Sequence, residues 1–311
     1  MAAYAVLDLG SNTVRLLIAE AEAHSPPPFR ILYQNQEITR LGEGLSQERK
    51  IAEKAEKRTL DLLVRYQEVI ARYAPLRLEV VGTAALREAT NAKDLLRQIE
   101  EALGWRVRIL SPEEEAYLTL LGVRSGPIPL PKLWMLLDIG GCSTELAQAE
   151  GVQMKRAISL PWGAVGIHEE FIPEDPPAPK SIKVLLASLR ERLGPSLSPF
   201  LPLTNHLLVG TAGTITTLAA IHLGLKEYDA EGINGLSLTQ IQIREIFDRL
   251  RQMPLGQRRE VPGLEAPRAD IILAGTAILL AVMEGLGRDR IVVSDGGLRE
   301  GILVSLLGSG G

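Results

Sequence analysis

The sequence predicts an α/β protein built from two duplicated domains. The chain has 311 residues, which is too long for one ordinary core and suits two domains of about 150 residues each. Two segments, starting at Tyr4 and Leu133, share the order apolar strand, Asp-x-Gly, small polar turn and apolar strand. Two Gly-Thr-Ala steps, starting at Gly82 and Gly210, recur at nearly the same spacing. Repetition of two unrelated motifs in one order indicates a duplication.

In the first half, the alternation of apolar and polar residues predicts a hairpin over 4–20 and a further strand over 29–39. A helix over 46–73 follows, then a strand over 77–82, a helix over 92–103, a strand over 106–110 and a helix over 112–121. The Gly- and Pro-rich stretch 126–131 is a candidate linker. We therefore expect domain I over 1–125 and domain II over 126–297, with the C-terminal helical segment 298–311 packing back on domain I.

The second half repeats this pattern. It begins with the second hairpin, contains a Pro-rich loop over 172–179 and a helix over 215–223, and ends with a strand over 290–294. The longest apolar run, 271–283, is shorter than the roughly 20 residues that span a bilayer, so it predicts a buried helix and no membrane partner.

Composition narrows the class of function. The hydrophobic fraction of 46% and the charged fraction of 23% are ordinary for a globular protein. The net charge of −4 argues against a nucleic-acid partner, whereas local arginines can still hold a small polyanion. The chain has one cysteine, Cys142, and no cationic region before an apolar stretch at its start, so we expect a cytoplasmic protein without a signal peptide.

The two hairpin turns are candidate phosphate sites. Small residues let backbone N–H groups point at an anion, and hydroxyls add donors. An aspartate at the strand end would repel phosphate unless a cation lay between them, so the paired turns suggest bound Mg²⁺. The alternative is two ordinary turns, which would be the better interpretation for either turn alone. The candidate metal ligands are Asp8, Asp138 and Glu145, and the candidate phosphate-binding residues are Gly10, Ser11, Asn12, Thr13, Gly140, Gly141, Ser143 and Thr144.

The Gly-Thr-Ala steps form a second pair of candidate anion sites. Gly213 and Thr214 stand where a helix opens, and a helix N-terminus attracts anions. The equivalent step in the first half is followed by Arg87, whose guanidinium could bind phosphate through two hydrogen bonds.

The stretch from Ser111 to Glu115 predicts a helix start and one unexplained acid. Ser111 suits the N-cap, Pro112 the first helical position, and Glu114 completes a capping box. Glu115 has no such role and could take a proton from water. A solvated surface glutamate is the alternative.

These motifs resemble those of the exopolyphosphatase and guanosine pentaphosphate phosphohydrolase (Ppx/GppA) family, in its short two-domain form. The resemblance implies duplicated actin/Hsp70/sugar-kinase-like (ribonuclease H-like) domains with an interdomain cleft. The matching segments are DLGSNTVRL, GTAALREATN, SPEEEAYLTLLGV, DIGGCSTEL, ISLPWGAVGIHEEF, GTAGTITTLAAI, RADIILAGTAIL and SDGGLREGIL.

The resemblance also implies roles for residues. Glu115 matches the catalytic glutamate, Asp138 and Glu145 match acids associated with the metal, and Arg15, Arg87 and Arg268 look like phosphate contacts. The implied cofactor is Mg²⁺, with Mn²⁺ as an alternative, and a homodimer is compatible with the pattern. Two departures matter, because Cys142 and Ala212 stand where the family usually has glycine, and a side chain there would strain any backbone that needs a positive φ.

The function expected from this resemblance is hydrolysis of the terminal phosphate of inorganic polyphosphate, with Mg²⁺ and a water activated by Glu115. Hydrolysis of guanosine pentaphosphate (pppGpp) to the tetraphosphate is the main alternative. A non-catalytic regulator that binds guanosine penta- or tetraphosphate is a third, and a phosphotransferase is less favoured. The sequence does not choose between the first two substrates.

Overall fold

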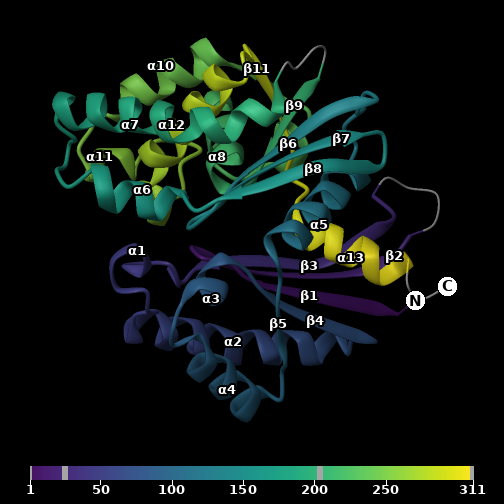
Figure 1. Cartoon of the computed structure of the whole chain (residues 1–311). Coiled ribbons are helices and arrows are strands. Elements are labelled where there is room, and N and C mark those ends of the chain that lie inside the picture. Colours follow the sequence, from purple (N-terminus) through teal and green to yellow (C-terminus); the bar gives the residue numbers. More distant parts are fainter. Residues whose placement is uncertain (1, 23–26, 202–205, 309–311) are drawn as a thin grey trace. The chain divides into compact units, whose positions relative to one another are not determined.

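The chain forms two compact units, of which one is discontinuous in sequence. The computed structural model describes residues 2–22, 27–201 and 206–308 (Figure 1). Unit 1 comprises Met1–Pro127 and Gly296–Gly311, and unit 2 comprises Ile128–Asp295. The last three residues of the predicted C-terminal segment, 309–311, lie outside the described residues.

Unit 1 is a five-stranded mixed sheet in the order β3-β2-β1-β4-β5. β1 and β2 form the predicted antiparallel hairpin, and β4 and β5 run parallel to β1. The strands are β1 (Ala3–Leu9), β2 (Thr13–Ala21), β3 (Phe29–Ile38), β4 (Arg77–Gly82) and β5 (Val107–Ile109). The helices are α1 (Leu45–Glu48), α2 (Glu53–Tyr73), α3 (Ala84–Glu88), α4 (Ala92–Leu103), α5 (Pro112–Ser125) and α13 (Leu298–Gly308).

The C-terminal helix α13 completes the core of unit 1. Figure 1 shows α5 and α13 along one face of the sheet and α2 and α4 along the other. The backbones of α5 and α13 are in close contact. A methyl group on Gly122 would lie only 1.9 Å from the carbonyl oxygen of Gly297. A methyl group on Gly301 would lie 1.7 Å from the carbonyl oxygen of Leu118. Apolar residues of α13 then pack on the inner residues of β1, β2 and β4, among them Leu298, Ile302, Leu303, Val6, Leu17 and Val81.

Unit 2 is a six-stranded mixed sheet in the order β10-β11-β9-β6-β7-β8. The strands are β6 (Leu133–Ile139), β7 (Thr144–Glu150), β8 (Gln153–Leu160), β9 (Leu207–Thr211), β10 (Ser237–Thr239) and β11 (Arg290–Val293). The α-helices are α6 (Ala164–Phe171), α7 (Pro179–Leu197), α8 (Ala212–Leu223), α9 (Ala230–Ile233), α10 (Gln240–Leu250), α11 (Leu255–Arg258) and α12 (Ile272–Gly285). Two 3-10 turns, η1 (Ser198–Phe200) and η2 (Ala266–Arg268), complete the unit.

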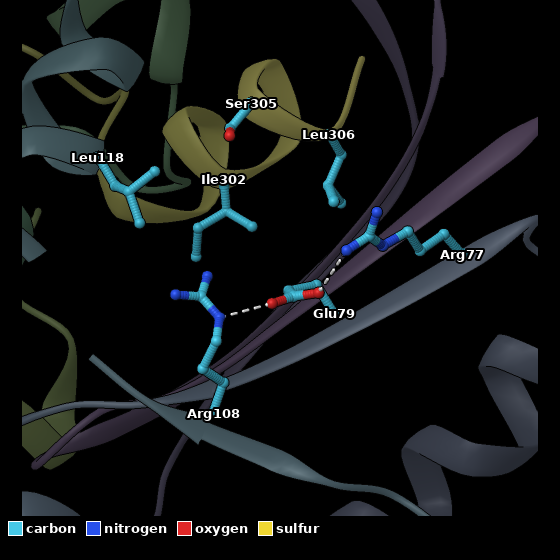
Figure 2. A pocket seen from close by; sticks show the side chains of 7 residues that line it. All are labelled: Arg77, Glu79, Arg108, Leu118, Ile302, Ser305 and Leu306. Atoms are coloured by element: carbon cyan, nitrogen blue, oxygen red, sulfur yellow. Dashed lines mark hydrogen bonds and ion pairs between the residues drawn. The ribbon is translucent and has the colours of Figure 1, made fainter. Parts of the chain in front are cut away.

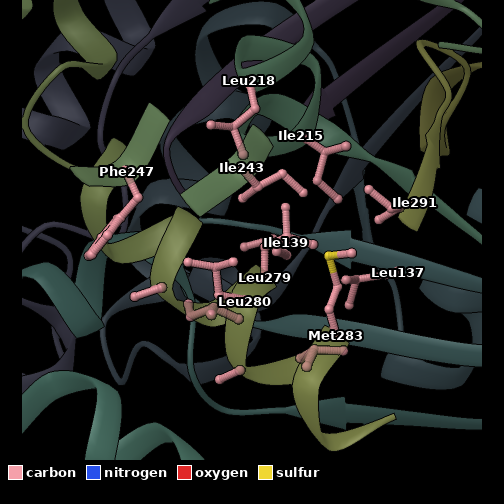
Figure 3. Close-up of a cluster of buried hydrophobic side chains, with 14 of the residues drawn as sticks. Leu137, Ile139, Ile215, Leu218, Ile243, Phe247, Leu279, Leu280, Met283 and Ile291 are labelled. Carbon is pink, nitrogen blue, oxygen red and sulfur yellow. The ribbon is translucent and has the colours of Figure 1, made fainter. Parts of the chain in front are cut away.

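Helix α12 lies at the centre of the core of unit 2. Its residues from Ile272 to Met283 are all buried, as the long apolar run predicts. Figure 3 shows Leu279, Leu280 and Met283 of this helix packed among side chains from the sheet and from α8 and α10. In the described part of the chain, no helix combines the length and the apolar character needed to cross a bilayer.

The two sheets repeat one topology, which agrees with the predicted duplication. The order β3-β2-β1-β4-β5 of unit 1 corresponds to β8-β7-β6-β9-β11 of unit 2, which adds β10 at the edge. The register also repeats, since Asp8 pairs with Arg15 across one hairpin and Asp138 pairs with Glu145 across the other. Equivalent positions in the two units can therefore be compared residue by residue.

Three predicted helix boundaries are wrong, and the simplest is that of α5, which ends at Ser125 and not at residue 121. The helix predicted over 46–73 is interrupted after α1, because Arg49 adopts a left-handed conformation with φ 53°. The Asn91 side chain bonds both backbone polar groups of Ile51, which fixes this break. In unit 2 the helix predicted from residue 215 begins at Ala212. The Gly-Thr-Ala step is therefore part of the helix start.

Candidate functional site

Asp8 ends β1 as a deeply buried carboxylate. It is 2% exposed, and its Oδ2 lies 3.7 Å from Nη1 of Arg15 on the neighbouring strand. Its Oδ1 has no hydrogen-bond partner in the described part of the chain. Burial raises the pKa of Asp8, and the positive charges of Arg15 and Arg299 offset this only in part, while Glu300 raises it further. The fold thus holds a carboxylate in an environment that disfavours its charge.

The turn after Asp8 directs consecutive backbone N–H groups to one side. The Ser11 carbonyl accepts a hydrogen bond from the Gly42 N–H, and the Asn12 carbonyl accepts from the N–H groups of Thr39 and Arg40. In a planar trans peptide the N–H points opposite to the C=O. The next two N–H groups, those of Asn12 and Thr13, therefore point away from the segment 39–42. Such successive N–H groups form an anion-binding concavity.

Glu115 and Arg87 are paired next to this turn. The Ser11 hydroxyl accepts a hydrogen bond from the Ala85 N–H at 3.1 Å, which ties the turn to the start of α3. Arg87, in the last turn of α3, donates from Nη1 to the Leu110 carbonyl at 2.9 Å and to Oε2 of Glu115 at 3.1 Å. The structure therefore brings the predicted base and a predicted phosphate-binding arginine into direct contact.

The start of α5 sets the position of Glu115. The Ser111 hydroxyl accepts from the Glu114 N–H, as the N-cap prediction requires. The Glu114 carboxylate, however, contacts Arg108 instead of closing a capping box, so that part of the prediction is wrong. Glu115 is 7% exposed, whereas Glu113 in the same turn is exposed. Glu115 is thus a buried acid in the first turn of a helix.

In unit 2, two carboxylates face each other across the hairpin. Asp138 at the end of β6 pairs with Glu145 on β7, and residues opposite each other in an antiparallel pair have Cβ atoms about 5 Å apart. Glu145 is 2% exposed and accepts a hydrogen bond from the Ser159 hydroxyl at 2.7 Å. Like charges at such positions are destabilising unless a cation or proton compensates them.

In the turn of unit 2, as in that of unit 1, two consecutive carbonyls accept backbone hydrogen bonds, but the pair begins one position earlier relative to the strand-end aspartate. The carbonyls of Gly140 and Gly141 accept hydrogen bonds from the N–H groups of Ala164 and Val165, at the start of α6. The N–H groups of Gly141 and Cys142 therefore point away from α6. Ser143 is buried in the turn, and the Thr144 hydroxyl donates to the Trp162 carbonyl, which ties the turn to the end of β8.

Arg268 lies against the start of α8. Its Nε and Nη2 donate to Oε2 of Glu265 at 3.2 and 3.0 Å, and its side chain is 7% exposed. A methyl group on Gly213 would lie 1.7 Å from Nη1 of Arg268. The missing side chain of Gly213 therefore makes room for the guanidinium at a helix N-terminus, where an anion is stabilised. The predicted Thr214 instead packs against Gly275 of α12.

The two departures from the family glycines differ in backbone conformation. Ala212 has φ 67°, a left-handed conformation that costs a non-glycine residue free energy. Cys142 has no positive φ, so its side chain strains nothing. The expected strain is therefore confirmed at one position and absent at the other.

Each unit by itself offers oxygen donors of the kind that a divalent cation prefers. Mg²⁺ prefers oxygen ligands and commonly uses one or two carboxylates while keeping several waters. The buried Oδ1 of Asp8 and the opposed carboxylates of Asp138 and Glu145 are ligands of this kind. Among the described residues, no three His, Cys, Asp or Glu side chains gather into a metal-binding group.

Sequence reasoning missed several residues of these sites. Arg299 and Glu300, in the first turn of α13, are close enough to Asp8 to shift its pKa, although they follow it by almost the whole chain. Ser159 and Glu265 hold Glu145 and Arg268 in place. The motif that begins at Ser294 contains Arg299 and Glu300, so it was the available signal for the first pair.

The chain matches both a protein-family model and a curated relative. Residues 17–310 match the model of the Ppx/GppA phosphatase family. The chain is 31% identical over 314 residues to the bifunctional 3-dehydroquinate synthase/phosphatase of Fusobacterium nucleatum, covering 96% of this chain and 46% of that protein. It thus spans about half the length of this curated relative.

Solved structures give the same result over full length. The crystal structure of the Aquifex aeolicus Ppx/GppA family member is 33% identical, with a TM-score of 0.83 and coverage of 100% of this chain and 99% of that one. The crystal structure of an exopolyphosphatase-like protein is 27% identical, with a TM-score of 0.89 and coverage of 98% and 97%. The chain belongs to the Ppx/GppA phosphatase family.

Proposed function

We propose that this protein is an exopolyphosphatase that removes the terminal phosphate of inorganic polyphosphate by attack of a water molecule. Family membership supports a phosphohydrolase acting on phosphate-containing molecules. The observation that carries the proposal is Glu115, a buried carboxylate held by Arg87 beside the anion-binding turn of Ser11 and Asn12.

Glu115 has the properties that a general base requires. A base must reach the water proton, and its carboxylate must be fixed and ionised. The hydrogen bond from Arg87 fixes the Glu115 carboxylate. Glu113 is exposed, and the half-buried Glu114 contacts Arg108, whereas Glu115 is buried and bonded to Arg87.

The proposed step is an in-line displacement. A water oxygen attacks the terminal phosphorus while Glu115 accepts the water proton. The bond between that phosphorus and the bridging oxygen breaks, inorganic phosphate is released, and the shortened chain leaves with the negative charge on its new terminal oxygen. Arg15 and the N–H groups of Asn12 and Thr13 bind phosphate oxygens in unit 1.

Unit 2 contributes further phosphate-binding groups. The N–H groups of Gly141 and Cys142 and the guanidinium of Arg268 at the start of α8 are the donors that we assign to this role. The ligands that we assign to Mg²⁺ are Asp8 of unit 1 and Asp138 and Glu145 of unit 2, and the ion would supply charge neutralisation on the phosphate oxygens.

The test is phosphate release from long-chain polyphosphate and from guanosine pentaphosphate, measured side by side with and without Mg²⁺. We expect Mg²⁺-dependent release from polyphosphate with the higher kcat/KM. Glu115→Gln should lower kcat about 10²–10⁴-fold, the usual contribution of a general base, with phosphate-chain binding retained.

Glu113→Gln is the matched control, because it removes an exposed carboxylate from the same helix turn and should leave kcat unchanged. Near-normal turnover of Glu115→Gln would remove Glu115 from the role of base. A clear preference for guanosine pentaphosphate would replace polyphosphate as the substrate.

A further inference from the structure

Unit 1 contains a cavity whose lining includes none of the residues that we assign to phosphate binding or catalysis. It has a volume of about 250 Å³ and lies where β4 and β5 meet α5 and α13 (Figure 2). A cavity just below the usual range of about 300–1,000 Å³ for drug-sized ligands suits a molecule of the size of one amino acid.

One side of the cavity carries both signs of charge. Glu79 of β4 lies between Arg108 and Arg77, with Oε1 2.8 Å from Nε of Arg108 and Oε2 3.5 Å from Nη2 of Arg77. The Glu79 side chain is 16% exposed. The Arg77 side chain is 56% exposed, and its 3.5 Å contact with Glu79 is longer than the 2.8 Å contact of Arg108. Arg108 also contacts Glu114, so two arginines balance two glutamates. A neutral cluster of this kind complements a ligand that carries one charge of each sign.

The other side of the cavity is apolar. Figure 2 shows Leu118 of α5 with Ile302 and Leu306 of α13 on the wall facing the charged residues, and the Ser305 hydroxyl beside them. These three apolar side chains are each less than a tenth exposed. Charges at an edge strand such as β5 guard against edge-to-edge pairing, but this does not explain an apolar wall opposite them.

We propose that this cavity binds a small zwitterion with an apolar side chain, of the class of leucine and phenylalanine. The ligand carboxylate bonds to the Arg77 guanidinium, and the ligand ammonium group bonds to the Glu79 carboxylate. The ligand side chain lies against Leu118, Ile302 and Leu306. All three interactions use chemistry that the lining residues already present.

The cavity is connected to the proposed active site through two helices. Leu118 follows Glu115 by one turn of α5, and Arg108 at the cavity contacts Glu114. Ile302 follows Arg299 and Glu300 on α13, whose backbone is in close contact with α5 at Gly122 and Gly301. A ligand that touches both helices therefore biases the position of Glu115, and the bound amino acid changes the rate of phosphate release. This regulatory part depends on the proposed function.

Binding is tested without any activity measurement. Isothermal titration of the full chain with leucine and with phenylalanine should give a Kd of about 1 mM or tighter. 4-Methylpentanoate lacks the ammonium group of leucine, and isopentylamine lacks its carboxylate. Each should bind at least about tenfold more weakly, because each loses one charge-assisted hydrogen bond. Absence of heat for both amino acids, or equal affinity for 4-methylpentanoate, would overturn the proposal.

Two arginine-to-alanine substitutions test whether the amino acid binds in this cavity. Arg77→Ala should weaken leucine binding by about tenfold or more, since it removes the cation that holds the carboxylate. Arg106→Ala is the matched control, because Arg106 is an exposed arginine nearby that pairs with Glu100 and does not line the cavity. Both residues are exposed, so both variants should keep the wild-type circular dichroism spectrum. Unchanged affinity in Arg77→Ala would place the site elsewhere.

The regulatory part is tested by phosphate release from polyphosphate with and without saturating leucine. We expect a change in kcat of at least about twofold, which Arg77→Ala abolishes at the same leucine concentration. Binding without a change in kcat would overturn the regulation alone. A protein that binds leucine but releases no phosphate from any substrate would count against the proposed function and leave the binding site standing.

Discussion

The hairpins of the two units share one register and differ in charge. In unit 1 the residue opposite Asp8 is Arg15, whereas in unit 2 the residue opposite Asp138 is Glu145. The first pair carries its own compensating cation, although at 3.7 Å it is a loose one. The second pair has two acids and a neutral hydroxyl donor, Ser159. After duplication of one scaffold, therefore, the same register position carries an acid opposite a base in unit 1 and an acid opposite an acid in unit 2.

The starts of α3 and α8 show a second difference between equivalent positions. Ala84 and Ala85 open α3 with ordinary backbone conformations, and Ser11 bonds to the Ala85 N–H. The equivalent residues of α8 are Ala212, which has a positive φ, and Gly213, which leaves space for Arg268. Unit 2 thus accepts backbone strain at the position where an arginine reaches the helix start. The predictions below test these differences, from the largest expected effect to the smallest.

Among the changes at these paired positions, neutralising Glu145 should have the largest effect. Glu145→Gln keeps the shape of the side chain but removes one of two opposed carboxylates, so we expect activity to fall about 10–100-fold and the Mg²⁺ concentration for half-maximal activity to rise. Titration of phosphate release against Mg²⁺ measures both. Glu150→Gln, near the far end of the same strand, is the control. An unchanged Mg²⁺ requirement would show that the acid pair serves packing only.

Gly213→Ala should reduce binding of the phosphate chain. The added methyl group must displace the buried guanidinium of Arg268, which we expect to raise the KM for polyphosphate by about tenfold. Ala85→Gly at the equivalent position of unit 1 removes a methyl group instead and should leave KM unchanged. Steady-state kinetics on both variants measures this. Equal KM values for both variants and the wild type would separate Arg268 from phosphate binding.

Asp8→Asn should change the pH dependence of stability. Because the pKa of Asp8 is raised in the folded state, the folded protein binds more protons than the unfolded one between the ordinary value of 3.8 and the raised value. Stability contributed by the protonated carboxyl is therefore lost as the pH rises through this window. With chelator present, Asp8→Asn should unfold at a Tm at or above that of the wild type at neutral pH, and the difference should shrink near pH 4. Thermal unfolding across pH measures it, and parallel Tm curves would contradict it.

Ala212→Gly should give the smallest effect, a gain in stability. Glycine adopts φ 67° without steric cost, so we expect the free energy of unfolding to rise by about 1 kcal/mol. Ala84→Gly at the equivalent position of unit 1 should lower it by about 0.5–1 kcal/mol, because no positive φ is relieved there. Urea unfolding gives both values. A loss of stability in Ala212→Gly would mean that contacts of the methyl group outweigh the strain.

Local patterns were sufficient for both hairpins and their turns, but not for the short edge strand β10. Both hairpins, β4, α4 and the buried α12 lie where alternation, turn residues and apolar runs predict them. Each of these elements is determined mainly by residues that are close together in the chain, so a local sequence pattern predicts it. The break between α1 and α2 depends on Asn91, which is distant in the chain, and no local pattern contains it.

The same distinction holds for the candidate sites. The acids and glycines of the turns were predicted from their spacing, and Glu115 was singled out because the helix cap did not account for it. The pairing of Arg87 with Glu115 and the approach of Arg299 to Asp8 arise from packing of separate helices. Sequence can name such residues as charged, but which charge meets which is decided only when α3, α5 and α13 pack on the sheet.

The position of α13 late in the sequence delays completion of the core of unit 1 during synthesis. Its side chains fill part of the core of unit 1, yet the ribosome synthesises them after the whole of unit 2. The nascent chain can therefore finish its second globule while the first still exposes the apolar surface that Leu298, Ile302 and Leu303 will cover. Such an unfinished intermediate is prone to self-association, so newly made chains should depend on chaperones until α13 has been synthesised.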